Sequence, residues 1–237
     1  MLINYSVIIP IKNEEDNIPR LVQEVREVMN DLKKPWELIL IDDGSTDESL
    51  NIIKSLQKTH PEIKLLSFIK NFGQSSAFHA GFKKAKGEIL ITLDGDLQND
   101  PSDIPKLLFA LKDHDMVCGW RQNRRDSVFK RVISRPSNII RSRICKDHVH
   151  DTGCSLKVFK KASLNQIKSF HGMHRFFPAL FKVEGLSVTE VKVKHRARIK
   201  GQSKYHLFNR SIGPILDMFA VYWMRKRRLR YQIKEDR

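Results

Sequence analysis

Two aspartates, one residue apart, end an apolar segment near the middle of the chain: Asp94 and Asp96 in ILITLDGDLQNDP. Ionised carboxylates are costly to bury, so a core strand that ends in two of them indicates that they bind something. Beside the amide oxygen of Gln98, this pair makes a set of hard oxygen ligands that suits Mg²⁺ or Mn²⁺. The alternative is a turn or a helix cap, for which Gly95 is also suitable. Because Asp42 and Asp43 end another apolar segment, we favour a site that holds a metal ion and a diphosphate.

The first hundred residues predict the elements that position these acids. Short apolar segments alternate with segments of helical periodicity, which is typical of a parallel α/β sheet. We expect strands at 5–11, 36–43, 63–69 and 88–94, and helices at 15–34, 45–60 and 75–86. The second helix should begin with a capping box formed by Ser45 and Glu48. Ligands of such sheets bind beyond the carboxyl ends of the strands, so the polar residues there should converge on one crevice.

The second half of the chain has a different pattern. We expect a helix at 102–113, strands at 115–120, 154–160 and 186–194, and one or two helices from about residue 206. The stretch 121–148 between them is strongly basic and largely helical in its pattern. These features predict a catalytic domain over 1–205 and a basic, helical C-terminal segment over 206–237.

Charge and cysteine content restrict the class of protein. The net charge of +16 over 237 residues favours a polyanionic partner, which means nucleic acid, an anionic membrane surface or a phosphorylated substrate. Three cysteines are too few for a disulfide framework and indicate a reducing compartment. The N-terminus lacks the pattern of a secretory signal, and no segment reaches the roughly 18–20 apolar residues of a membrane-spanning helix. We expect a cytoplasmic protein.

Five segments occur in an order that resembles one enzyme family: SVIIPIKNEEDNI, LILIDDGSTDES, NFGQSSAFHAGFKKAKGEILITLDGDLQNDP, DTGCSLKVF and HRARIKGQSKY. The chain resembles the family-2 glycosyltransferases of GT-A fold, in particular those that use dolichyl or undecaprenyl phosphate, such as dolichol-phosphate mannosyltransferase. The resemblance runs from about residue 4 to 230 and implies a Rossmann-like, mostly parallel mixed sheet flanked by helices. It departs at Lys12, where the family usually has an aromatic residue, and in lacking the C-terminal transmembrane helices of many relatives.

The resemblance also implies roles for individual residues. Asp94, Asp96 and Gln98 would hold the divalent ion on the donor diphosphate. Arg121 would contact the acceptor phosphate and Arg198 the donor, and both join the acid pair as catalytic residues. The remaining roles are a nucleotide-sugar pocket lined by Pro10, Glu14, Ile41, Asp43, Gly95, Arg198 and Lys204, and an acceptor-phosphate site made by Arg121, Arg131 and Ser134.

The kind of acceptor follows from what the chain lacks. A phosphate acceptor is already an anionic nucleophile and needs cations, whereas a sugar hydroxyl normally needs a carboxylate base. The QxxRW motif of polysaccharide-synthesising relatives is absent, and the mid-chain position reads DTGC. We therefore expect an inverting transfer from a UDP- or GDP-linked sugar to a polyprenyl phosphate. Asp151 in that motif has two interpretations, orientation of a substrate or capping of the next strand.

Other interpretations remain at this point. A GT-A enzyme that glycosylates a sugar or protein hydroxyl is the first alternative. A nucleic-acid-binding protein is the second, but no helix-turn-helix, zinc-finger or RRM signature supports it and the acidic strand ends oppose it, so we expect no nucleic-acid partner. The C-terminal segment has an apolar stretch, 212–224, followed by a cationic run, 225–230, which predicts peripheral contact with the cytoplasmic face of a membrane, directly or through an integral-membrane partner.

Overall fold

The computed structural model describes residues 2–121, 144–145, 147–197 and 212–229. Within these ranges, seven strands form a single sheet in the order β3-β2-β1-β4-β6-β5-β7. The first four strands in this order and the pair β5–β7 are parallel, whereas β6 runs antiparallel to both of its neighbours. The strands are β1 (Tyr5–Ile11), β2 (Trp36–Asp42), β3 (Ile63–Ser67), β4 (Ile89–Thr92), β5 (Met116–Arg121), β6 (Lys157–Lys160) and β7 (Val188–Val193).

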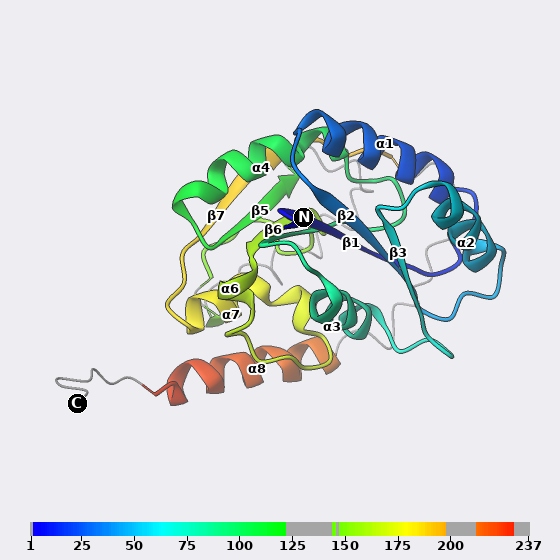
Figure 1. The fold of residues 1–237 in the computed structure, drawn as a ribbon. Helices are drawn as coiled ribbons and strands as arrows, with labels where there is room; N and C mark the ends of the chain where they lie inside the picture. Colours follow the sequence, from blue (N-terminus) through cyan, green and yellow to red (C-terminus); the bar gives the residue numbers. More distant parts are fainter. Residues whose placement is uncertain (1, 122–143, 146, 198–211, 230–237) are drawn as a thin grey trace, which may run out of the picture.

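Helices cover both faces of the sheet (Figure 1). One face carries α1 (Ile18–Asp31), α2 (Ser49–Thr59) and α4 (Ile104–Ala110), which is flanked by the short 3-10 helices η1 (Pro101–Asp103) and η2 (Leu111–Asp113). The other face carries α3 (Gln74–Lys84), α6 (Lys161–Leu164), η3 (Met173–Arg175), α7 (Phe177–Val183) and α8 (Ile212–Arg227). This three-layer arrangement with a mixed, mostly parallel sheet confirms the predicted fold class.

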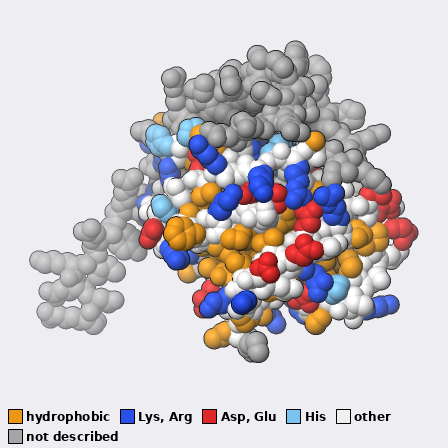
Figure 2. Space-filling model, turned by 90° about the horizontal axis from the view of Figure 1, so that it is seen from above, with side chains coloured by type: hydrophobic (Ala, Val, Ile, Leu, Met, Phe, Trp, Pro, Cys, Tyr) orange, Lys and Arg blue, Asp and Glu red, His pale blue; other side chains and the backbone are white. Residues whose placement is uncertain are grey.

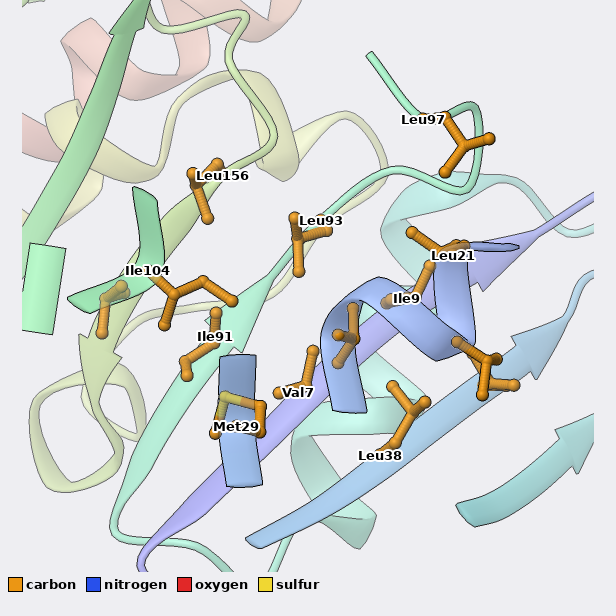
Figure 3. Packing of buried hydrophobic residues seen from close by; sticks show 14 of the residues in the cluster. Val7, Ile9, Leu21, Met29, Leu38, Ile91, Leu93, Leu97, Ile104 and Leu156 are labelled. Carbon is orange, nitrogen blue, oxygen red and sulfur yellow. The ribbon is translucent and has the colours of Figure 1, made fainter. Parts of the chain in front are cut away.

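The core on the α1 face follows from the apolar runs in the sequence. Val7 and Ile9 of β1, Leu38 of β2 and Ile91 of β4 are all fully buried and pack against helical side chains such as Leu21 (Figure 3). Strands that are covered on both faces read as near-continuous apolar runs, which explains why these strands are readily recognised in the sequence.

Aromatic side chains fill the core on the other face. Phe159 of β6 lies 5.3 Å from Phe177 and 5.6 Å from Phe181, measured between ring centroids. Met218 and Val221 of α8 are buried in the same cluster, so α8 packs on the body of the protein. The helices α6 and α7, which supply much of this cluster, are short and the sequence analysis did not predict them.

The strand order places a ligand-binding position beside β1. The chain runs outward from β1 to β2 and β3 on one side and to β4 on the other, so the carboxyl ends of β1 and β4 flank the point where the order reverses. Crevices at such reversal points are the usual ligand sites of open α/β sheets. Asp94 and Asp96 follow β4 and therefore lie at this position.

The predicted start of the second helix, with its capping box, is wrong. The helix α2 begins at Ser49, and its N-terminal residue Glu48 makes no capping bond with its side chain. Ser45 instead accepts a hydrogen bond from the backbone N–H of Asn13, and the N–H of Glu48 donates to Glu15. The polar groups thus join the two loops that follow β1 and β2, and they are not available for a capping box.

Candidate active site

Asp94 is the centre of a polar cluster that four segments supply. Its Oδ1 accepts a hydrogen bond of 2.7 Å from the Nε2 of Gln74 at the start of α3. Ser155, Lys157 and Arg121 also act on Asp94 and favour its ionised form. Burial and the charge of Asp96 nevertheless raise the pKa of Asp94 to about 6. Two carboxylates whose charges repel each other in this way favour a bound cation.

The Asp94–Gln98 turn has a constrained backbone. Leu97 has a φ of 60°, although its side chain is almost fully buried in the core. Asp96 is also buried, and its Oδ1 accepts a hydrogen bond of 3.2 Å from the backbone N–H of Gln98. A Cβ atom on Gly95 would lie 2.9 Å from the Cδ1 of Ile11, so a larger residue at this position would require the Ile11 side chain to move. The turn therefore holds the two acids against the end of β1.

The acid pair fits a divalent ion that shares its ligands with a substrate. Among the residues that the structure describes, no group of three or more His, Cys, Asp or Glu side chains could hold a metal ion. Mg²⁺ commonly binds through one or two carboxylates and completes its shell with phosphate oxygens and water. Two carboxylates that repel each other at the reversal point of the sheet match that requirement, whereas a site made only of protein ligands would not.

Asp43 organises the loop that follows β3. Its carboxylate accepts three hydrogen bonds, from the Asn71 side chain at 3.0 Å, the Phe72 N–H at 2.6 Å and the Gly73 N–H at 2.9 Å. Asp43 is only 4% exposed, and Gly73 is the N-cap residue of α3. Asp43 thus determines where α3 begins, and with it the position of Gln74 beside Asp94.

Replacing Asp43 with alanine should lower the free energy of unfolding by about 2 kcal/mol, because three donors would lose a charged acceptor together. Replacing Asn71, which is exposed and supplies one of the three donors, is the matched control and should cost well under half as much. Urea denaturation of both variants measures the difference. Equal losses would show that Asp43 does not organise the loop as described.

The other residues expected in the nucleotide pocket lie in different environments. Pro10 is partly exposed within β1, and Glu14 is partly exposed and accepts a hydrogen bond of 2.6 Å from Asn17. Ile41, by contrast, is fully buried and belongs to the core cluster on the α3 side. If Ile41 contacts the nucleotide, it does so through its backbone, because its side chain is in the core.

Arg121 and Asp151 form a buried ion pair next to the acid cluster. The Nε of Arg121 lies 2.7 Å from Oδ2 of Asp151, and its NH2 lies 2.9 Å from Oδ1. The two side chains are 12% and 6% exposed. Asp151 is thus the ion-pair partner of Arg121. This role differs from the two that the sequence suggested, orientation of a substrate and capping of the next strand. The paired carboxylate and burial act on Arg121 in opposite directions, and the net effect raises its pKa.

A further network fixes the segment that leads toward the expected donor-binding cations. The backbone N–H of Arg196 donates to the Gln98 carbonyl, and its guanidinium contacts Asp100 at 3.0 Å and Glu24. The N–H of Lys194 donates to Asp103 at 2.7 Å. Residues 194–196 are therefore attached directly beside the Asp94–Gln98 turn. The expected site residues Arg131, Ser134, Arg198 and Lys204 lie outside the described residues.

The face that carries α1 and α4 has mixed charge. Figure 2 shows Lys and Arg side chains interspersed with Asp and Glu on this face, with hydrophobic side chains between them. On α1, the ion pair Arg20–Glu24 joins charges of both signs. A continuous basic surface, which is the electrostatic feature of a nucleic-acid-binding protein, is not what this face presents.

Three members of the acid cluster, Gln74, Ser155 and Lys157, were not expected from the sequence. Lys157 is 3% exposed and donates to the Cys154 carbonyl from within β6. Lysine is rarely buried to this extent, but a lysine in an apolar segment could equally point to solvent, so the sequence offers little signal. Gln74 lies in the quoted NFGQSS segment, but its contact with Asp94 depends on how α3 packs.

A Rossmann-like mixed sheet with an acid pair at its reversal point defines the class of GT-A glycosyltransferases. Residues 6–168 match the model of glycosyl transferase family 2, and the chain belongs to this family.

Curated relatives point to one branch of the family. The chain is 40% identical over 227 residues to a dodecaprenyl-phosphate galacturonate synthase of Rhizobium johnstonii, covering 93% of this chain and 67% of the relative. It is 36% identical over 205 residues to an undecaprenyl-phosphate 4-deoxy-4-formamido-L-arabinose transferase of Pectobacterium carotovorum, covering 85% of this chain and 62% of the relative. The chain thus spans roughly two thirds of the length of these relatives.

Solved structures share the fold at low sequence identity. A Pyrobaculum calidifontis mannosyltransferase in complex with GDP-Man and Mn²⁺ matches with a TM-score of 0.62 and 19% identity, over 84% of this chain and 58% of that one. S. aureus TarS 1–349 in complex with UDP-GlcNAc matches with a TM-score of 0.65 and 17% identity, over 94% and 66%. At these identities the matches establish the architecture alone.

Proposed function

We propose that this protein transfers a sugar from a nucleotide-diphosphate donor to a polyprenyl phosphate, with inversion at the anomeric carbon. The observation that carries the proposal is the acid pair Asp94/Asp96 beside the buried pair Arg121–Asp151, in a family-2 chain. The names of the relatives at 36–40% identity support the same acceptor class.

The residues of the site divide the work of such a transfer. Asp94 and Asp96 would hold Mg²⁺ or Mn²⁺, assisted by Gln98. When bound, the ion supplies positive charge against the leaving diphosphate. Arg198 and Lys204 are proposed to bind the donor diphosphate, and Pro10, Glu14, Asp43 and Gly95 to surround the nucleotide. Arg121, Arg131 and Ser134 are proposed to bind the acceptor phosphate, whose oxygen then attacks in line.

A phosphate acceptor explains the chemistry of the cluster better than a hydroxyl acceptor does. A hydroxyl nucleophile needs a carboxylate that accepts its proton. The acid nearest to Arg121 is Asp151, and both of its oxygens are bonded to the guanidinium. A carboxylate held in this way is a poor proton acceptor, because protonation would break a buried ion pair. A phosphate oxygen is already ionised and needs no such base.

A panel of donors and acceptors tests the proposal. Purified protein with Mn²⁺ would be given UDP- and GDP-linked sugars together with undecaprenyl phosphate, dolichyl phosphate or free sugars. The expected result is a glycosylated polyprenyl phosphate from one donor class. Transfer to sugar hydroxyls alone would establish the alternative GT-A activity, and release of nucleotide without any acceptor product would also contradict the proposal.

Membrane contact is the second part of the proposal. In the described ranges, no helix has the length and hydropathy needed to cross a bilayer. The helix α8 packs inward through Met218 and Val221, while Phe219 and Trp223 are 56% and 61% exposed. Basic side chains follow in its last turn. We propose that residues 206–237 form the membrane-contacting part beside a catalytic part over 1–205, on the cytoplasmic face, a location that the three free and buried cysteines fit.

Replacing Phe219 and Trp223 together with serine should weaken binding to anionic vesicles by about tenfold, because two exposed aromatic anchors are lost. The matched control is Phe109→Ser, which removes a 72% exposed aromatic from α4 on the opposite face. Co-sedimentation with phosphatidylglycerol vesicles at low and high salt measures the effect. Equal binding by the native protein, the double variant and Phe109→Ser would show that α8 does not bind the membrane, and would favour an integral-membrane partner.

A further inference from the structure

A single glutamate on the edge strand β7 holds the loop that carries Asp151. The Oε2 of Glu190 accepts hydrogen bonds from the backbone N–H of His150 at 2.9 Å and from its Nδ1 at 2.8 Å. The Oε1 of Glu190 accepts a third from the backbone N–H of Asp151 at 3.1 Å. One carboxylate thus bonds two consecutive backbone N–H groups, an arrangement that fixes the direction of the chain at this point.

The burial of Glu190 makes these hydrogen bonds energetically important. Its side chain is only 11% exposed, and a carboxylate buried to this degree is costly unless donors surround it. Glu190 lies opposite Cys118 in the β5–β7 register, three residues before Arg121 on β5. The carboxylate therefore reaches the loop from β7, and the position of its backbone is set by the sheet.

The loop has other restraints besides Glu190. His148 has a φ of 53°, and Asp147 accepts a hydrogen bond from the N–H of Val149 at 3.2 Å. The ring of His150 stacks on Trp120 at 4.3 Å. These contacts fix the part of the loop before Asp151. The backbone N–H of Arg121 donates to Oδ2 of Asp151 at 3.3 Å, and the bond from the Asp151 N–H to Glu190 fixes the backbone from which this carboxylate extends.

We propose that Glu190 is a positioning residue of the transferase site: it holds the His150–Asp151 backbone so that the Asp151 carboxylate keeps the Arg121 guanidinium directed beside Asp94. The contacts run in one direction through the sheet, from Glu190 to Asp151 and from Asp151 to Arg121. Arg121 and Asp94 in turn act on each other electrostatically. This role rests on the proposed function, because Arg121 is assigned there to the acceptor phosphate.

Kinetics of Glu190→Ala separate positioning from a structural role. The expected result is a 10- to 100-fold lower kcat/KM for the polyprenyl phosphate, as for other outer residues that orient a catalytic group, with an unchanged KM for the nucleotide sugar. Glu190→Gln keeps one of the two accepting oxygens, which can serve the Asp151 N–H, and should therefore lose clearly less activity than Glu190→Ala. Lys192→Ala, an exposed position on the same face of β7, is the control and should leave both constants unchanged.

Two further measurements do not depend on the kinetic constants alone. Hydrogen–deuterium exchange of the backbone over 147–156 should increase in Glu190→Ala more than exchange over β1 to β4, so that the loosening is local to the loop. A double-mutant cycle with Asp151→Asn should be non-additive, because both substitutions release the same guanidinium. If Glu190→Ala does not fold, Glu190→Asp, whose shorter side chain cannot reach all three donors, takes its place with the same expectations.

The outcomes distinguish this inference from the proposed function. Native kcat/KM in Glu190→Ala, equal losses in Glu190→Ala and Glu190→Gln, or additive effects with Asp151→Asn would each overturn the positioning role. A native protein that transfers sugar to none of the polyprenyl phosphates would instead overturn the proposed function. Increased exchange over 147–156 in Glu190→Ala would then still establish that Glu190 holds the loop.

Discussion

Asp96→Asn is expected to abolish sugar transfer, lowering kcat by at least about a thousandfold, while the protein stays folded. The substitution keeps the size of the side chain but removes one of the two charges that make the acid pair attractive to a divalent ion. The variant should therefore bind Mn²⁺ much more weakly, and the lost repulsion from Asp96 should at the same time lower the pKa of Asp94. Turnover assays and calorimetric titration with Mn²⁺ measure the two effects.

The pH dependence of metal binding gives this experiment an internal check. Asp94 has a pKa of about 6 in the folded protein, and its ionised form is the metal ligand. Mn²⁺ affinity of the native protein should therefore rise as the pH increases through about 6 and level off above 7. Asp113→Asn, an exposed acid in η2, is the control and should behave as native. Near-native turnover in Asp96→Asn would show that the acid pair does not hold the ion.

The second large effect is expected at Arg121. Arg121→Met removes the guanidinium that bonds both oxygens of the buried Asp151 carboxylate, which should lower the free energy of unfolding by about 3 kcal/mol. Transfer should fall by at least about a hundredfold, because the group proposed to bind the acceptor phosphate is lost. Denaturant unfolding and acceptor kinetics measure the two losses separately.

A double variant separates the structural and catalytic parts of that effect. When Arg121→Met is combined with Asp151→Leu, no charge is left unpaired, and most of the lost stability should return. Transfer should not return, because an apolar pair cannot bind a phosphate. A double variant with native activity would show that the Arg121–Asp151 pair only stabilises the fold.

Periodicity in the sequence was sufficient to predict the layers of the fold and the convergence of the strand ends. Buried strands such as β1 and β2 are continuous apolar runs, and a parallel α/β pattern brings their carboxyl ends to one edge. The place of Asp94 and Asp96 follows from that geometry alone. The insertion of the antiparallel strand β6 between β4 and β5 does not follow, because a short apolar run carries no information about its partners.

The surroundings of the acid pair were predictable only in part. Arg121 was expected from the resemblance, but its pairing with Asp151 joins residues 30 positions apart. Gln74 and Glu190 are ordinary polar residues in a helix and an edge strand, and only the packed structure shows that they contact Asp94 and the Asp151 loop. Polar contacts between distant segments depend on the exact register of the elements, which periodicity does not determine.

The strand order also has a consequence for how the chain acquires its structure during synthesis. The neighbours of β5 in the described sheet are β6 and β7, and both follow it in the sequence. When Met116–Arg121 has left the ribosome, β1 to β4 can already pair with one another, but β5 has no strand to join until residues 157–160 are made. Strand pairing over such a separation is slow, because the intervening loop must first be closed. The half of the site that carries Arg121 is thus assembled after the half that carries Asp94, and the apolar residues of β5 are exposed to aggregation in the interval.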